Sequence, residues 1–373
     1  MSVISKLFRN SEIYDIIQKA KNGEELDIKE IETLFRTREI QLLGYMADNV
    51  RKEVSGNNVS YISNLILNYT NTCIVKCKFC AFYRKVGSTE GYLLSKEMIG
   101  RRAERAWREL GVTQILIQGG VNPDLPIEYY EDAFVEIKAR TKGVAIHGLS
   151  TSEIEYISKR ERMSIREVLE RLQKAGLDSV PGAGGEILVD SVRRKLGRNL
   201  SLTDGWLNVM EEAHKLGIRT SSTMVYGHIE TPADKAKHLI LIRDLQKKTG
   251  GFMAFIPWNM EIENTEMFKE GLVTRRASGI ELLRSVAVAR LVFQHHIKNI
   301  QTGWLTNGIP LAQLALTYGA NDWGGTIFEE EVIPATGKEA GNLQARTIVE
   351  SVKAMGRPVV ERDNFYSIIR NFN

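Results

Sequence analysis

The sequence predicts an α/β protein whose core is a TIM-like (β/α)8 barrel, and three observations favour this fold. From Tyr61 onward, short runs rich in β-branched residues recur along the chain. Stretches with helical periodicity separate these runs, and this alternation implies a parallel sheet. About seven or eight such units in a chain of 373 residues favour a sheet closed into a barrel over a doubly wound one.

The residues before the barrel are expected to be helical. Apolar positions such as Ile13, Ile17 and Ile31 recur with helical spacing among charged residues. The stretch Thr37–Val54 has the pattern of one amphipathic helix. We therefore divide the chain into an N-terminal helical segment packed on the barrel (1–58), the barrel (59–335) and a C-terminal helical extension (336–373).

The barrel strands are expected at the β-rich runs, and helix-start signals lie between several of them. The runs are Ser63–Leu67, Gln114–Gln118, Val144–His147, Asp178–Val180, Arg219–Met224, Phe252–Phe255 and Asn299–Gln301. Capping boxes of the form Ser-x-x-Glu begin at Ser150, Ser164 and Ser278, and Thr231 precedes a proline at the first helical position. Small or polar residues follow the strands, as the active-site loops of a barrel require.

Composition excludes several classes of protein. No run of eighteen apolar residues could span a bilayer, and the first residues lack the apolar core of a signal peptide. The net charge of +4 is small, and Lys and Arg are mixed with Asp and Glu. We therefore expect a cytoplasmic protein with neither a membrane nor a nucleic-acid partner.

All three cysteines lie within eight residues, in the spacing C-x3-C-x2-C, directly after the first expected barrel strand. Three thiolates on one loop, Cys73, Cys77 and Cys80, can each bind one iron of a 4Fe-4S cluster and leave the fourth iron open. S-adenosylmethionine (SAM) can chelate that open iron. One electron from the cluster then cleaves SAM to a 5′-deoxyadenosyl radical.

Other uses of the cysteines fit less well. A structural zinc site requires a fourth protein ligand, and the next histidine along the chain is the distant His147. The odd number and the short spans disfavour disulfides. Buried free thiols would not explain the clustering. The sequence therefore predicts a 4Fe-4S cluster and SAM as cofactors.

Residues near the cysteines suggest further contacts. Phe82 is expected to pack against the adenine of SAM, with a core position as the alternative. Basic residues crowd the same loop, and they either dock an acidic electron donor such as a flavodoxin or ferredoxin or form a solvated loop. These residues are Lys76, Lys78, Arg84 and Lys85.

The cysteine loop and the aromatic residues after it resemble the radical SAM superfamily. The longer string Cys80–Arg84 with Gly91-Tyr92 and Leu94-Ser95 is similar to the group that contains the futalosine-pathway enzymes of menaquinone synthesis and the deazaflavin-core synthases. Further segments resemble the cyclic dehypoxanthinyl futalosine synthase family, from about Arg36 to the end. They are Gln114–Gly120, Pro123–Pro126, Asp178–Gly182, Gly185–Asp190, Gly227–Thr231, Gly250–Phe252, Phe255–Trp258 and Gly319–Asp322.

This resemblance implies a small-molecule substrate, dehypoxanthine futalosine. The deoxyadenosyl radical would take hydrogen from C4′ of its ribose, and the carbon radical would add to the attached benzoate ring. The sequence departs from the family pattern at Asn122 and in the stretch Trp258–Glu263. The alternatives are a sibling reaction, either aminofutalosine synthase or half of the deazaflavin-core synthase, and a metal-binding protein without radical chemistry.

Other candidate residues lie at the expected strand ends. Gln118, Gly119 and Gly120 are expected to contact SAM, because glycines let backbone approach a ligand closely. Ser150 and Glu186 either bind the SAM ribose or serve the start of a helix. The candidate proton acceptors are His147, His228, Glu186 and Asp322, the last expected at the end of the last strand; His295 and His296 are expected at the surface or in structural roles.

Overall fold

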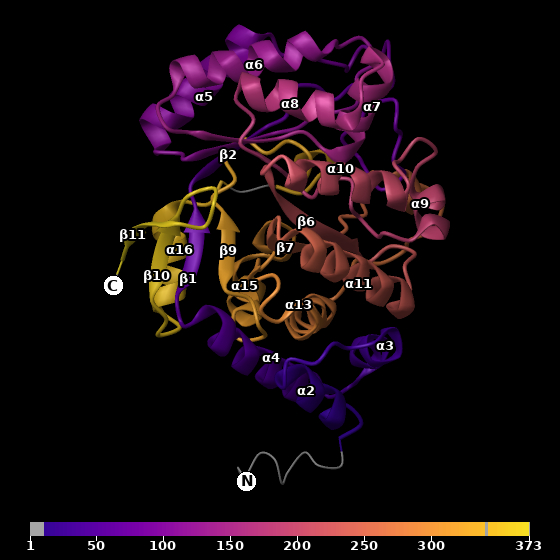
Figure 1. Cartoon of the computed structure of the whole chain (residues 1–373), viewed down its shortest axis with the longest axis vertical. Helices are drawn as coiled ribbons and strands as arrows, with labels where there is room; N and C mark the ends of the chain where they lie inside the picture. The colour runs from indigo at the N-terminus through magenta and orange to yellow at the C-terminus, as the bar shows by residue number, and fades with distance from the viewer. Residues whose placement is uncertain (1–10, 340–341, 373) are drawn as a thin grey trace.

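Seven parallel strands follow one another in chain order around the centre of the computed structural model, which describes residues 11–339 and 342–372. Helices surround these strands (Figure 1). The strands are β2 (Asn64–Leu67), β3 (Gln114–Ile117), β4 (Ala145–Gly148), β5 (Ser179–Val180), β6 (Arg219–Tyr226), β7 (Phe252–Asn259) and β8 (Asn299–Ile300). They lie at the seven β-rich runs that the sequence indicated.

An eighth strand closes the ring. This strand is β9 (Asp322–Gly325), which a parallel bridge between Gln301 and Asp322 joins to the end of β8. The chain just beyond β9 pairs with β2 through a second bridge, between Leu65 and Phe328. The predicted (β/α)8 barrel is therefore confirmed.

A smaller sheet is attached where the barrel closes. It has the order β11-β10-β1-β9 and is formed with β1 (Val59–Ile62), β10 (Val359–Arg362) and β11 (Ile368–Asn371). Strand β1 runs into β2 after only one residue, Ser63, so a nearly continuous strand belongs to both sheets. The two sheets thus form one framework.

Helices follow most barrel strands, and the expected caps are present. Capping boxes begin at Ser150, Ser164 and Ser278, and Thr231 caps the helix that starts with Pro232. The helices are α5 (Lys96–Leu110), α6 (Ile127–Arg140), α7 (Thr151–Glu161), α8 (Ile165–Ala175), α9 (Asp190–Leu196), α10 (Thr203–Lys215), α11 (Pro232–Thr249), α12 (Glu266–Lys269), α13 (Gly279–Phe293), α14 (Trp304–Asn307), α15 (Ile309–Ala315), η1 (Pro334–Thr336) and α16 (Ala345–Lys353).

Three N-terminal helices cover one end of the barrel (Figure 1). They are α2 (Tyr14–Lys21), α3 (Ile28–Arg36) and α4 (Ile40–Ser55). Helix α3 packs on α11 and α13, and α4 packs on α13. Ile31, Leu34 and Phe35 form the buried face of α3, which explains the apolar spacing in the sequence.

The C-terminal segment differs from its prediction as a helical extension, which was wrong. It contains α16, but β10 and β11 then form a hairpin at the edge of the smaller sheet. Val359 and Val360 are buried and pair in parallel with β1, where β-branched residues pack well. The Asp363 carboxylate accepts hydrogen bonds from the backbone N–H groups of Phe365 and Ser367, both at 2.8 Å, which closes the turn.

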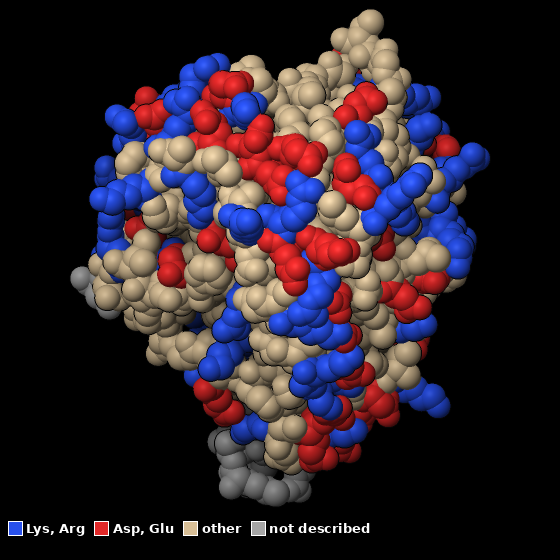
Figure 2. Space-filling view, turned by 45° about the horizontal axis from the view of Figure 1, so that its top comes forward, with Lys and Arg blue, Asp and Glu red and all other residues tan. Residues whose placement is uncertain are grey.

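The surface carries mixed charge. On the face shown in Figure 2, Lys and Arg side chains lie among Asp and Glu side chains. None of the helices formed by residues 11–339 and 342–372 has the length and apolar character needed to cross a bilayer.

Candidate active site

The barrel encloses a cavity of about 310 Å³ that reaches from the cysteine loop to the turn of the C-terminal hairpin. Side chains at alternate strand positions form its wall, because successive residues of a strand face opposite sides. They include Asn64 and Ile66 on β2, Gln114 and Leu116 on β3, and Ser221, Thr223 and Val225 on β6. Cys80 lies at one end of the cavity, and Arg362, Asn364 and Tyr366 line the other.

The three cysteines lie on the loop after β2 as partly buried free thiols. Backbone hydrogen bonds fix this loop: Cys73 N–H donates to Arg84 O at 2.9 Å, and Lys78 N–H donates to Leu196 O at 2.7 Å. The N–H of Val121 donates to Cys73 Sγ at 3.3 Å. A thiolate that binds a metal is stabilised by such a donor. The loop is thus held in place by the segment after β3 and by the end of α9.

Gly119 and Gly120 pack directly against the cysteine loop. A Cβ on Gly120 would overlap Thr72 O and lie 2.9 Å from Cys73 Cβ, and a Cβ on Gly119 would lie 2.9 Å from Thr70 O. The glycines therefore let the end of β3 approach the loop closely. Gln118 lines the cavity, whereas neither glycine does. Direct contact of the two glycines with SAM stays a prediction.

Glu186 lies in the loop after β5 and reaches the cavity. Its Oε2 atom is buried and has no hydrogen-bond partner in the part of the chain that the structure describes. Burial raises the pKa of this carboxyl, although Arg193 opposes the shift. The Arg193 guanidinium lies 3.7 Å from Glu186 Oε2 and is itself fully buried. It donates to the carbonyls of Gly184 and Ser201, at 2.8 and 2.6 Å, and so holds the loop. Glu186 Oε2 is thus a hydrogen-bond acceptor close to the cysteines that no described residue satisfies.

Comparison with known proteins agrees with this arrangement. Residues 67–242 match the family model of the radical SAM superfamily, and residues 249–371 match that of the CofH/MqnC C-terminal region. The chain is 37% identical to the cyclic dehypoxanthine futalosine synthase of Halalkalibacterium halodurans, over 96% of this chain and 95% of that protein. The chain belongs to the radical SAM superfamily.

Two further proteins are similar to this radical SAM protein, one in sequence and one in structure. It is 36% identical to the 5-amino-6-(D-ribitylamino)uracil–L-tyrosine 4-hydroxyphenyl transferase of Methanococcus aeolicus, over 87% of this chain and 90% of that protein. The structure of the FeFe-hydrogenase maturase HydG from Carboxydothermus hydrogenoformans superimposes with a TM-score of 0.73, at 20% identity, over 98% of this chain and 83% of that one. At that identity, the superposition supports the fold alone.

The donor set fits the cofactors of the superfamily, a 4Fe-4S cluster and SAM. Cys73, Cys77 and Cys80 have the superfamily spacing and would hold the cluster. The cavity begins at Cys80, so a ligand on the open iron would lie inside it. We propose that Glu186 accepts a hydrogen bond from SAM, because this residue lines the cavity and its buried Oε2 receives no hydrogen bond from the described residues.

Replacing Glu186 with glutamine is expected to weaken SAM binding by roughly tenfold, because a charge-assisted hydrogen bond is lost. The iron content should not change, since the cysteines are intact. Titration of SAM into the reconstituted protein, followed by calorimetry, measures the effect. Glu170→Gln, at a 52% exposed side chain on α8, should bind SAM like the wild type. Equal affinity of all three proteins for SAM would show that Glu186 does not bind SAM.

Phe82 and Ser150, expected to contact SAM, do not line the cavity. Phe82 is buried edge-on against Tyr92, with ring centroids 6.3 Å apart. The Ser150 hydroxyl caps α7, and its partner Glu153 also accepts hydrogen bonds from the Gly119 N–H at 3.2 Å and from the Tyr69 hydroxyl. Glu153 therefore ties α7 to the end of β3, a role that the capping pattern alone did not indicate.

Of the two histidines expected as proton acceptors, only His147 lines the cavity. Its Nδ1 lies 2.7 Å from Ser179 Oγ, and burial lowers its pKa to about 3, so its ring is neutral at physiological pH. His228 is buried outside the cavity lining, and its Nε2 donates to Val225 O at 3.0 Å while its Nδ1 accepts from Ile229 N–H. Burial lowers the pKa of His228 as well. The structure thus gives His228 a local structural role.

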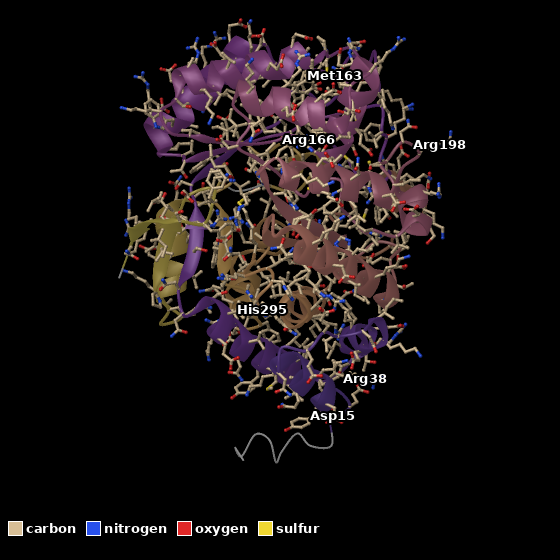
Figure 3. The ribbon with its side chains drawn as sticks, viewed as in Figure 1. Asp15, Arg38, Met163, Arg166, Arg198 and His295 are labelled. Carbon is tan, nitrogen blue, oxygen red and sulfur yellow. The ribbon has the colours of Figure 1, made fainter. Side chains whose placement is uncertain are left out.

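His295 and His296, expected on the last long helix, lie just after it and do not line the cavity. His295 follows α13, is exposed, and lies toward the N-terminal helices α2–α4 (Figure 3). Asn122, a departure from the family pattern, is also outside the cavity lining, and its side chain accepts a hydrogen bond from Asp124 N–H at 3.1 Å.

Asp322 begins β9 instead of ending it, so its predicted place was wrong. It is fully buried outside the cavity lining, and its carboxylate forms a bidentate ion pair with Arg362, at 2.6 and 3.0 Å. The Ser60 hydroxyl and the Gly324 N–H also donate to it. These donors occupy the carboxylate, and the ion pair joins β9 to the C-terminal hairpin.

Replacing Arg362 with methionine is expected to lower the free energy of unfolding by about 3–5 kcal/mol, because it leaves the buried Asp322 carboxylate without its positively charged partner. Equilibrium unfolding in urea measures the change. The control is Arg370→Met in the same hairpin, where the side chain is 67% exposed and its nitrogen lies 3.7 Å from Glu361. That variant should lose less than about 1 kcal/mol. Equal losses would contradict a structural role for the buried pair.

Several residues of the cavity escaped the sequence analysis. Glu330 lines the cavity after β9, and burial raises its pKa to about 7. The run Glu329-Glu330-Glu331 after the last strand was a usable signal, since polar residues at strand ends form barrel sites. Other polar residues of the wall that were not expected as site residues include Asn259, Glu261, Gln301, Arg362, Asn364 and Tyr366. The last three come from the hairpin that was expected to be helical.

Proposed function

We propose that this protein converts dehypoxanthine futalosine into cyclic dehypoxanthinyl futalosine, a step of menaquinone biosynthesis. The observation that carries the proposal is the 37% identity to the cyclic dehypoxanthine futalosine synthase of Halalkalibacterium halodurans over 96% of the chain. The match with the CofH/MqnC C-terminal region supports it, because residues 249–371 include much of the cavity wall.

When bound, the cluster and SAM supply a 5′-deoxyadenosyl radical that takes hydrogen from C4′ of the substrate ribose. The protein binds the substrate beside Cys80 and excludes water from the enclosed barrel interior. Apolar wall residues such as Ile66, Leu116 and Ile256 suit the aromatic ring of the substrate. Polar residues of the same wall, such as Asn259 and Gln301, would bind the sugar.

After ring closure, the ring becomes aromatic again by losing one electron and one proton. The electron would pass to the oxidised cluster, and Glu330 is our candidate for the group that takes up the proton. Its carboxylate accepts hydrogen bonds from the backbone N–H groups of Val332 and Ile333, at 2.7 and 3.0 Å, which fixes it on the cavity wall. Burial raises its pKa to about 7, and a general base works best with a pKa near the working pH. His147 is a much weaker base.

A second candidate function is transfer of a 4-hydroxyphenyl group to 5-amino-6-(D-ribitylamino)uracil. The observation that favours it is the 36% identity to the Methanococcus aeolicus transferase over 87% of the chain. The two candidates share the cofactors and the radical, so they differ only in what the cavity binds. Aminofutalosine synthase activity is a third reaction to include in substrate trials.

The electron donor and the cytoplasmic location stay predictions. Lys76 and Lys85 are exposed on the cysteine loop, as a docking site for an acidic flavodoxin or ferredoxin requires. Lys78 and Arg84 instead form ion pairs with Glu270 and Glu90.

Anaerobic turnover of the reconstituted protein tests the proposal. The reaction contains dithionite, SAM and dehypoxanthine futalosine, and mass spectrometry follows 5′-deoxyadenosine and the product. A product lighter than the substrate by two hydrogens, formed with deoxyadenosine, is expected. Deoxyadenosine without that product would indicate that the protein catalyses a sibling reaction on another substrate. An intact cluster that does not cleave SAM would refute radical chemistry.

A further inference from the structure

Two buried hydrogen-bond acceptors lie in the cavity wall at the end of β7. Asn259 and Glu261 are only 6% and 5% exposed, and both line the cavity. Among residues 11–339 and 342–372, no group donates a hydrogen bond to Asn259 Oδ1 or to Glu261 Oε2. Unpaired buried acceptors are rare in folded proteins because each one costs free energy. Two at one place indicate that a ligand supplies the donors.

The cations near Glu261 leave one of its oxygens available. Lys338 Nζ donates to Glu261 Oε1 at 2.6 Å and to Thr306 O at 2.6 Å, so it holds the carboxylate from one side. Arg276 Nε lies 3.3 Å from Glu261 Oε2, but its hydrogen bonds go to Glu263, at 3.0 Å. Glu261 Oε2 is therefore fixed in position and can still accept a hydrogen bond.

The chemistry of the pair selects the ligand. The carboxylate oxygen of Glu261 and the amide oxygen of Asn259 can accept hydrogen bonds from hydroxyl groups. A carboxylate or phosphate on the ligand would be repelled by Glu261. The pair lies near Glu186 on the wall, because Glu186 O accepts a hydrogen bond from Val225 N–H on β6, and β6 pairs with β7 as far as Asn259. The pair belongs to residues 249–371, which match the CofH/MqnC C-terminal region, whereas Glu186 and the cysteines belong to residues 67–242, which match the radical SAM superfamily. A pair outside the segment shared by the superfamily suits the substrate better than the common cofactor.

We propose that Asn259 and Glu261 bind the sugar hydroxyl groups of the substrate, with Lys338 as the residue that positions Glu261. In its specific form this inference rests on the proposed function, since dehypoxanthine futalosine carries a ribose. The pair would then determine which substrate this chain binds.

The test measures binding without turnover. Dehypoxanthine futalosine is titrated by calorimetry into the anaerobic, reconstituted protein with SAM present and no reductant. Glu261→Gln is expected to raise the Kd for the substrate by roughly tenfold or more, and Asn259→Ala by roughly threefold or more, because one charged and one neutral hydrogen bond are lost. The Kd for SAM and the iron content should not change. Glu263→Gln is the matched control, because Glu263 shares Arg276 but does not line the cavity.

A series of substrate analogues, each lacking one ribose hydroxyl, identifies the hydroxyl that donates to Glu261. The analogue that lacks this hydroxyl should bind the wild type and Glu261→Gln with equal affinity. Unchanged substrate affinity in Glu261→Gln and Asn259→Ala would overturn the inference. Loss of SAM affinity in place of substrate affinity would overturn it as well.

Failure of the proposed function has a different signature. In that case the wild type does not bind or convert dehypoxanthine futalosine, and the titration is repeated with 5-amino-6-(D-ribitylamino)uracil, which carries a hydroxylated ribityl chain. Weaker binding of this compound to Glu261→Gln than to the wild type and Glu263→Gln would support the hydroxyl site. Equal binding to all three proteins would overturn it.

Discussion

Replacing Cys80 with alanine is expected to reduce SAM cleavage to background. The cluster needs all three thiolates of the loop to keep a single iron open, and no other cysteine exists in the chain to replace the lost ligand. Cys80 is also the cysteine that lines the cavity, so its iron would lie next to bound ligands. Iron and sulfide content after anaerobic reconstitution, together with 5′-deoxyadenosine formed with dithionite, measure the loss.

The control for this variant is Lys85→Ala on the same loop. Lys85 is exposed and is not a ligand, so the cluster and dithionite-driven SAM cleavage should match the wild type. Lower activity with a flavodoxin alone would agree with a docking role for this lysine. A Cys80→Ala protein that keeps its cluster and cleaves SAM normally would show that the cysteine loop is not the cluster site.

Replacing Gly120 with alanine is expected to impair cluster assembly although no ligand is removed. The new Cβ would overlap Thr72 O and lie 2.9 Å from Cys73 Cβ, and the obstructing oxygen is backbone that cannot rotate away. Either β3 or the cysteine loop has to move, at a cost of roughly 1–3 kcal/mol. The iron content should fall to less than about half of the wild-type value, and Tm should fall by several degrees.

Gly197→Ala is the matched control for Gly120→Ala. Gly197 also faces the cysteine loop, but a Cβ there would lie 3.4 Å from Cys77 Cα, an ordinary van der Waals distance. Its backbone is extended, with φ of −168°, so alanine fits without strain. Normal iron content is expected for this variant. If both variants assembled the cluster normally, the close approach of β3 would have no functional role.

Local patterns predicted much of the fold. The strands of the barrel were visible as runs rich in β-branched and apolar residues, because the strand positions that pack against the helices favour such residues. The capping boxes at Ser150, Ser164 and Ser278 were visible because a cap joins residues three positions apart. The hairpin of β10 and β11 was missed, because Val359 and Val360 become strand only by pairing with β1, which lies about three hundred residues earlier.

The sequence by itself determined the barrel, the cysteine loop and the cofactors, because these depend on spacing within short segments. Only the tertiary structure decided which polar residues face the cavity. It places Glu330, Asn259 and Glu261 on the wall, and it shows Asp322 and His228 engaged elsewhere. The physical reason is that burial and pairing partners depend on contacts between distant segments. A carboxylate such as Asp322 looks available in the sequence until the fold brings Arg362 to it.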